Sequence, residues 1–143
     1  MILRAVAYVS TAARALGQED LDALLVDARD FNAKTLVTGA LLYDAGVFFQ
    51  YFEGPEPGMV EVYDRIKKAK THQGLIELLN RPIDQRLFAE WHMGFSHAPG
   101  TVVQQLANAK WHESVKGLRK SGARSIGMDL LLDFWASARR TPD

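Results

Sequence analysis

The sequence predicts an α+β fold, a ferredoxin-like βαββαββ sandwich. Three observations predict it. Five segments are rich in β-branched and aromatic residues, two helical segments with apolar stripes separate them, and the chain ends in further helical stretches. In this order, both helices cover one face of a five-stranded mixed sheet, and the C-terminal helices are appended to it.

The N-terminal residues predict a strand and then a helix. The stretch "LRAVAYVS", residues 3–10, is β-rich, and Tyr8 falls on the same face as Val6 and Ser10. A helix over 18–32 follows, because acidic residues occupy its first turn and apolar residues recur at helical spacing. Its apolar stripe consists of Leu21, Leu24, Leu25, Ala28 and Phe31.

A hairpin comes next. The segments "LVTGALLYD", 36–44, and "GVFFQYFEG", 46–54, are joined by a tight turn. Alternation puts Phe48, Gln50 and Phe52 on one face of the second segment. A glutamine is unexpected between two phenylalanines on a buried face, because an unsatisfied buried amide costs about 1–3 kcal/mol. Backbone, water, another side chain or a ligand must therefore hydrogen-bond it.

The remaining elements of the sheet layer follow in order. A second helix begins at Pro55 or Pro57, since proline is favoured in a first helical turn. Two more strands are predicted at 74–83 and, in "WHMGFS", at 91–96. The apolar positions of the second helix are Met59, Val62, Tyr63, Ile66 and Ala69.

The C-terminal part is predicted to be a helical extension. Residues 1–97 form one domain, and 98–143 add helical stretches over 102–120 and 126–140. The last helix is apolar over a wide surface, so part of it should pack on the sheet near Trp91 and Met93. The rest either meets a second copy or a partner, or is fully covered by the sheet and the preceding helix. Its apolar residues are Ile126, Met128, Leu130, Leu131, Leu132, Phe134 and Trp135.

Composition excludes several classes of function. The 143 residues contain 17 basic and 17 acidic residues, which gives no support for direct nucleic-acid or membrane-surface binding. No cysteine is present, so disulfides, thiol catalysis and thiolate metal sites are excluded. No apolar segment is long enough to span a bilayer, so a cytoplasmic protein is expected. The histidines lack metal-binding spacing; they are His72, His92, His97 and His112.

Three polar residues are predicted to converge on one inner face. Asn32 lies on the apolar stripe of the first helix, and Tyr8 and Gln50 lie on strands that are commonly central neighbours in this fold. Each alone has a simpler interpretation: a core tyrosine, a glutamine bound to backbone, and an asparagine at a helix C-terminus. Together they form a neutral hydrogen-bonding site between apolar walls, which suits a flat heteroaromatic ligand.

On these residues the chain resembles the BLUF family of flavin-binding blue-light sensors. The resemblance spans residues 1–97 and has four ordered motifs. They are "AYVS", the helix end "ARDFN", the hairpin "TGALLYDAGVFFQYFEG", and the closing segment "IDQRLFAEWHMGFS".

The resemblance implies a role for each residue. The flavin ring should lie between Leu24 and Ile66, with Asn32 bound to its carbonyl and imide edge. Gln50 should bridge Tyr8 and the flavin. Light should draw an electron and then a proton from Tyr8, after which the Gln50 amide rearranges and the absorption band shifts to the red. Trp91 and Met93 should pass the change to the far side of the sheet, and His72 should lie at the cofactor.

Two departures from the family pattern concern the cofactor and the photocycle. The segment after the second helix reads Ala-Lys-Thr-His where relatives carry Asp-Pro-Arg-His, so Lys70 or Arg29 should replace the usual arginine near the phosphate. FAD is expected, and FMN and riboflavin remain open. Phe31 replaces a residue that is often polar in relatives, which should affect the recovery rate.

The resemblance implies a sensor, not an enzyme. The sequence contains no catalytic domain, so the signal should pass to a separate protein, either a signalling enzyme or a transcription regulator, and a homo-oligomer is expected. Two alternatives share the outline fold: an acylphosphatase-like hydrolase, and an interaction module without photochemistry. The hydrolase needs a phosphate-cradling loop with an arginine, for which "VSTAARALG" is a poor candidate.

Overall fold

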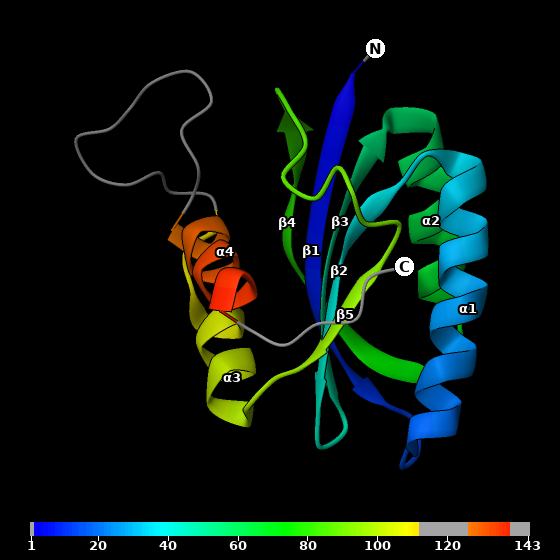
Figure 1. The fold of residues 1–143 in the computed structure, drawn as a ribbon, viewed down its shortest axis with the longest axis vertical. Helices are drawn as coiled ribbons and strands as arrows, with labels where there is room; N and C mark the ends of the chain where they lie inside the picture. The colour runs from blue at the N-terminus through cyan, green and yellow to red at the C-terminus, as the bar shows by residue number, and fades with distance from the viewer. Residues whose placement is uncertain (1, 112–125, 138–143) are drawn as a thin grey trace.

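The structure, a computed structural model, describes residues 2–111 and 126–137. Within them a five-stranded sheet lies between two helical layers (Figure 1). The strands are β1 (Leu3–Ala12), β2 (Thr38–Asp44), β3 (Val47–Pro55), β4 (His72–Ile83) and β5 (Gly94–His97). The helices are α1 (Gln18–Thr35), α2 (Glu56–Lys68), α3 (Gly100–Asn108) and α4 (Ile126–Ser137).

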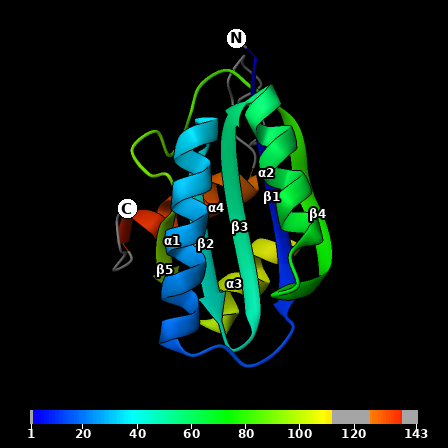
Figure 2. The same ribbon diagram turned by 90° about the vertical axis from the view of Figure 1, so that its right-hand side faces the viewer.

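The sheet confirms the predicted α+β class and its mixed sheet. The strand order is β4-β1-β3-β2-β5, and only the β2–β5 pair is parallel among the described strands. β1 and β3 are therefore neighbours near the centre, and Tyr8 lies directly opposite Gln50. Figure 2, which views the sheet from the side of α1 and α2, shows β3 running between these two helices in projection.

The two faces of the sheet belong to two separate apolar cores. Alternation along β3 sends Phe48 and Phe52 towards α1 and α2, and Phe49 and Tyr51 towards α3 and α4. We call the first core the pocket-side cluster; its buried residues include Val6, Tyr8, Leu21, Leu25, Phe48, Phe52, Met59, Val62 and Met93. We call the second the far-side cluster; its buried residues include Phe49, Tyr51, Leu79, Phe88, Leu106, Trp111, Met128, Leu131 and Trp135.

Element boundaries differ from the prediction where backbone conformation or pairing intervenes. α1 continues to Thr35, because its capping residue is Leu36 in the left-handed conformation at φ 63°, and β2 therefore starts only at Thr38. The fifth strand is Gly94–His97 and not 91–96. Its pairing with β2 begins at Gly94, because the two preceding carbonyls, of His92 and Met93, are already bound by side chains of α1.

The C-terminal helices cover the far side of the sheet. α3 ends at Asn108, short of the predicted 120, and residues 112–125 and 138–143 lie outside the described part of the chain, as does His112. In α4, Met128, Leu131 and Trp135 are buried, while Ile126 is 41% exposed. The sheet and α3 therefore cover most of the apolar stripe of α4. The exposed apolar residue lies at the start of this helix, at Ile126.

Candidate functional site

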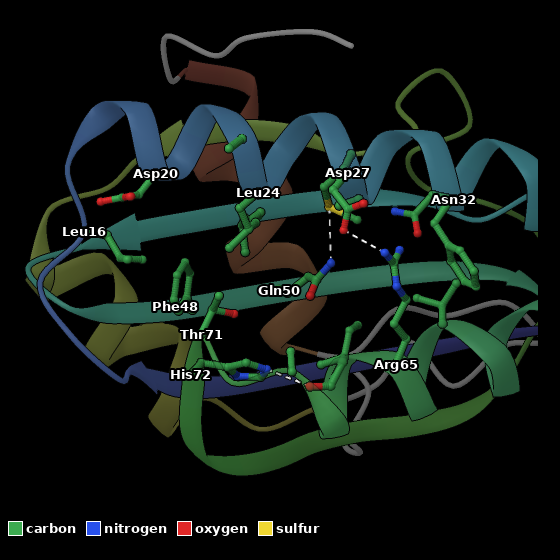
Figure 3. A pocket seen from close by; sticks show the side chains of 18 of the residues that line it. Leu16, Asp20, Leu24, Asp27, Asn32, Phe48, Gln50, Arg65, Thr71 and His72 are labelled. Atoms are coloured by element: carbon green, nitrogen blue, oxygen red, sulfur yellow. Dashed lines mark hydrogen bonds and ion pairs between the residues drawn. The ribbon is translucent and has the colours of Figure 1, made fainter.

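A cavity of about 440 Å³ lies between α1 and α2, above the pocket side of β1 and β3 (Figure 3). Leu24 from α1 and Ile66 from α2 line it from opposite helices, and Phe48 and Gln50 line it from β3. Its volume falls within the usual range for small-molecule sites, which is about 300–1,000 Å³. The cavity therefore has the predicted apolar walls, Leu24 and Ile66, with the polar Gln50 between them.

A chain of hydrogen bonds passes through the floor of this cavity. The Tyr8 hydroxyl donates to Gln50 Oε1, and Gln50 Nε2 donates to Met93 Sδ at 3.4 Å. All three side chains are buried and line the cavity. The buried amide is thus satisfied by a phenol at one end and a thioether at the other, and it has a second N–H for a further acceptor.

Burial also fixes the protonation state of Tyr8. Removal from water disfavours a phenolate, so the pKa of Tyr8 is raised far above its ordinary value of 10.0. Repulsion from the nearby Tyr63, whose phenol also becomes negative when it ionises, adds to the rise. Tyr8 is therefore a neutral hydrogen-bond donor to Gln50 at any moderate pH. An electron taken from it would leave a phenol whose proton already points at the Gln50 carbonyl oxygen.

Asn32 lies inside α1 and faces the cavity. It is 3% exposed, and its Nδ2 donates to the His92 carbonyl at 2.8 Å. The alternative that Asn32 caps the helix is wrong, because the helix continues for three residues and Leu36 is its cap. The amide also has an acceptor oxygen and a second N–H, which suit a carbonyl and imide edge.

His72 closes the cavity from the start of β4. Its Nε2 lies 2.8 Å from the Ile66 carbonyl, and its Nδ1 lies 2.8 Å from Ser10 Oγ. A carbonyl only accepts, so Nε2 carries a proton, and in the neutral ring Ser10 donates to Nδ1. The ring centre lies 5.9 Å from that of Tyr8. His72 thus ties α2, β1 and β4 together beside the phenol.

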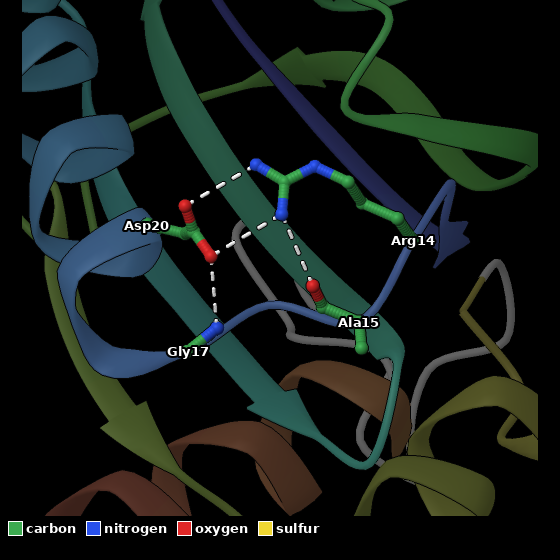
Figure 4. Close-up of polar contacts among 4 residues, drawn as sticks. All are labelled: Arg14, Ala15, Gly17 and Asp20. Carbon is green, nitrogen blue, oxygen red and sulfur yellow. Dashed lines mark hydrogen bonds and ion pairs between the residues drawn. The ribbon is translucent and has the colours of Figure 1, made fainter.

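Two arginines at the cavity mouth were missed by the sequence analysis. Arg14 pairs with Asp20 at 3.2 Å, and Asp20 also accepts from the Gly17 N–H at 3.0 Å (Figure 4). The pKa of Asp20 is lowered, first by its hydrogen bond from Arg14 and then by the Gly17 amide. Arg65 pairs with Asp27 at 2.7 Å (Figure 3), and all four charged residues line the cavity.

Arg65 is held in a second way. Its guanidinium carbon lies 4.4 Å above the centre of the Phe31 ring. Both arginines were hidden in the sequence, because Arg14 lies in a loop without periodicity and Arg65 sits beside the apolar face of its helix. Only the fold brings them to one opening.

Two residues predicted near the cofactor, Arg29 and Lys70, and the predicted relay residue Trp91 lie outside the cavity lining. Arg29 does not line the cavity; its Nε donates to the Met93 carbonyl at 2.9 Å. Lys70 does not line it either. Trp91 packs on the far side, where its ring centre lies 5.7 Å from that of Trp135. Trp91 and Met93 thus contact opposite sides of the sheet: α4 packs against Trp91, and Met93 lies on the cavity side.

Within residues 2–111 and 126–137, no group of three or more potential metal ligands is close enough to hold an ion. No helix in these ranges is long and apolar enough to cross a membrane.

Comparison with known proteins identifies the family. Residues 3–94 match the model of BLUF, described as sensors of blue-light using FAD. The chain is 37% identical over 90 residues to photoactivated adenylate cyclase subunit beta of Euglena longa, which covers 62% of this chain and 10% of that protein. It is 35% identical over 81 residues to subunit alpha of the Euglena gracilis enzyme, over 57% of this chain and 8% of that protein. The chain therefore spans about a tenth of the length of these curated relatives.

Solved structures agree with this match. The dark state of the BLUF protein BlrB is 28% identical with a TM-score of 0.64, over 67% of this chain and 73% of that one. The photo-activated state of BlsA is 27% identical with a TM-score of 0.64, over 76% and 78% of the two chains. With the paired Tyr8 and Gln50 on its central strands and a family match over 3–94, the chain belongs to the BLUF family of blue-light sensors.

Proposed function

We propose that this chain is a photoreceptor that binds a flavin non-covalently in the cavity between α1 and α2 and signals through rearrangement of Gln50. The observation that carries the proposal is the hydrogen bond from Tyr8 to Gln50 inside a cavity with apolar walls. One amide joins the phenol to the cavity, so a change at the phenol reaches whatever the amide contacts.

The lining of the cavity suits a flavin ring. A flat ring with a carbonyl and imide edge needs apolar surfaces on its faces and neutral donors and acceptors at one edge. Leu24 and Ile66 supply the surfaces, and Asn32 and Gln50 supply amides. FAD is the cofactor we propose, as the family description states; the family match alone leaves FMN and riboflavin open. One BLUF structure, the BlrP1 protein of Klebsiella pneumoniae, is described with FMN; it is 30% identical over 64% of this chain and 24% of that one, with a TM-score of 0.59.

The bound flavin would supply blue-light absorption and accept an electron. Tyr8 would give that electron and pass its phenol proton to Gln50 Oε1, at which it points, while the Gln50 nitrogen releases a proton towards the flavin; the electron and a proton would return to Tyr8 in the dark. The Gln50 amide would then rotate or tautomerise, because its two ends differ as donor and acceptor and exchange of these roles changes every bond it makes. Met93 accepts from the same amide, so it would sense the change first on the protein side.

The output follows from what lies next to Met93. Trp91, two residues earlier, packs against Trp135 of α4, so we propose that the change passes across the sheet to the C-terminal helices α3 and α4. The receiving protein is a separate signalling enzyme or transcription regulator in the cytoplasm, and the sensor acts as a homo-oligomer without catalytic activity of its own. The match covers only 10% of the Euglena longa cyclase subunit, so the activity in that protein's name is not part of this proposal.

Purification and illumination test the proposal. The protein should purify yellow, and its flavin absorption band should move to the red under blue light and return in the dark. A colourless protein that hydrolyses acyl phosphates would support the acylphosphatase-like alternative. A colourless protein without activity would support the interaction module.

A further inference from the structure

The segment that carries Trp91 and Met93 has no regular secondary structure, yet it crosses from one side of the sheet to the other. Phe88 belongs to the far-side cluster and Met93 to the pocket-side cluster. Between them the Trp91 carbonyl accepts from the Gly39 N–H at 2.8 Å. Since buried backbone groups need partners, the groups that bind this segment decide where Met93 lies.

Glu53 binds the start of this crossing. Its side chain is fully buried, and its Oε2 accepts from the N–H groups of Leu87 at 2.8 Å and Phe88 at 2.6 Å. Its Oε1 accepts from Leu87 at 2.9 Å and from the Tyr51 hydroxyl at 2.9 Å. Burial raises the pKa of Glu53 above its ordinary value, and these hydrogen-bond donors offset part of that rise. Both oxygens act as acceptors, which is the pattern of an ionised carboxylate.

Arg86 fastens the residue just before these amides. Its Nη1 donates to Thr38 Oγ1 at 2.8 Å, and its Nη2 donates to the Leu36 carbonyl at 2.7 Å. The start of the crossing is thus bound to β3 by Glu53 and to the beginning of β2 by Arg86. Neither Glu53 nor Arg86 lines the cavity.

One strand therefore holds both ends of the crossing. Gln50 and Glu53 are three residues apart on β3, so their side chains leave opposite faces of the sheet. Gln50 contacts Met93 on the pocket side, and Glu53 contacts Leu87 and Phe88 on the far side. The distance between the Gln50 amide and the Met93 sulfur therefore depends on the contact at Met93 and on the binding of Leu87 and Phe88 by Glu53.

We propose that Glu53 is a positioning residue: its buried carboxylate fixes residues 87–93 on β3 and so keeps the Met93 sulfur against the Gln50 amide. The consequence for the photocycle rests on the proposed function. A Met93 that is held in place slows the rearrangement of Gln50 in either direction, so release of the segment speeds the return to the dark state.

The test compares Glu53→Gln with Tyr51→Phe. The glutamine has nearly the same shape, but its NH2 group faces backbone donors, so bonds to Leu87 or Phe88 are lost. Tyr51→Phe removes a donor to the same carboxylate, leaves the amides of the segment bound, and keeps the ring that packs 5.5 Å from Phe88. The measurements are amide hydrogen exchange in the dark, relative to β1, and the dark-recovery rate after illumination.

For Glu53→Gln we expect exchange over 87–93 to rise about tenfold relative to β1, recovery to accelerate about threefold or more, and the size of the red shift to be retained. Tyr51→Phe should stay within about twofold of wild type in both rates. If the segment exchanges no faster than β1 in Glu53→Gln, or exchanges faster while recovery keeps its wild-type rate, the proposal is overturned.

Two safeguards keep the outcome readable. Glu53→Asp retains the charge but shortens the side chain, and it replaces Glu53→Gln if that variant does not fold. Exchange over 87–93 and dark recovery should then also be faster than in the wild type, by smaller factors. Failure of the proposed function shows itself separately, as a wild-type protein that binds no flavin or does not shift. The exchange measurement needs neither flavin photochemistry nor light.

Discussion

The two faces of β3 are built in opposite ways. On the far side, Phe49 stacks on Trp111 with ring centres 5.5 Å apart, and α3 and α4 complete a core made entirely by the chain. On the pocket side, Phe48 and Gln50 of the same strand border a cavity of about 440 Å³. One face is filled by protein, and the other leaves space for a ligand.

The difference lies in how each face treats its polar groups. Glu53 and Tyr51 satisfy each other and the neighbouring backbone on the far side. The pocket-side amides, Gln50 and Asn32, each make one donor contact to the protein and have further bonding capacity. A face on which a buried carboxylate binds a phenol and backbone amides is held rigidly, whereas a face with adaptable amides can switch. The predictions below test this contrast, beginning with the largest effect.

Gln50→Leu should abolish the light-induced red shift while flavin still binds. Leucine keeps similar bulk, and Asn32 and the apolar walls remain, but both ends of the switching amide are gone. Difference absorption spectra after blue illumination measure the effect, and the flavin content of the purified protein is the control. A normal shift in this variant would mean that the amide is not the switch.

Tyr8→Phe should also abolish the shift and leave a yellow protein, because phenylalanine has neither the proton nor an accessible electron to give. Tyr63→Phe is the matched control: Tyr63 belongs to the same pocket-side cluster, but its hydroxyl donates to Glu77 at 2.8 Å and it does not line the cavity. Transient absorption should show a tyrosine radical in the wild type. A tryptophan radical instead would transfer the donor role away from Tyr8.

On the filled face, one added methyl group should cost stability and leave the photochemistry intact. A Cβ on Gly127 would lie less than 3.0 Å from atoms of the Trp111 indole. Gly127→Ala should therefore lower the free energy of unfolding by about 1–3 kcal/mol, as overpacking does, with an unchanged red shift. Urea denaturation measures it, and Ser137→Ala, exposed on the same helix, is the control. An unchanged urea midpoint would mean that the Trp111 indole can move enough to accept the added methyl group without loss of stability.

The sequence predicts this contrast only in part. Alternation along β3 and the usual position of the first and third strands correctly placed Tyr8, Gln50 and the two phenylalanines. The spacing of Asn32 from the leucines of its helix correctly placed it inside. These are local periodicities, and a residue's face follows directly from them.

The crossing segment could not be predicted in the same way. Residues 84–93 have no periodicity, and their backbone groups are bound by residues far away in sequence, such as Glu53 and Arg29. For the same reason Arg29 was predicted at the cofactor although it binds the Met93 carbonyl. Long-range satisfaction of backbone groups depends on the folded chain and leaves no local pattern.

A smaller effect is expected at the cavity mouth. If a flavin phosphate reaches Arg65, Arg65→Gln should lower affinity for FMN about three- to tenfold relative to riboflavin. The effect is small because Arg65 exchanges one anionic partner, Asp27, for another. Lys34→Gln is the control, since Lys34 pairs with Asp30 on the same side of the molecule but does not line the cavity. An equal loss of affinity for FMN and for riboflavin would mean that Arg65 does not contact the phosphate and acts only at the flavin ring or in the structure of α2.

The smallest expected effect is that of alkaline pH on the switch. At pH 9.5 about a quarter of an ordinary phenol is ionised, but burial raises the pKa of Tyr8 far above 10.0. The size of the red shift should therefore stay constant from about pH 7 to about pH 9.5. Stability has a matching sign: a raised pKa in the folded state means that the unfolded chain loses its tyrosine protons first, so the folded state loses stability only above about pH 10. Circular dichroism at each pH shows whether the protein is still folded, which separates ionisation of Tyr8 from unfolding. A red shift that falls with an apparent pKa near 10 in a folded protein would show that water reaches the Tyr8 hydroxyl.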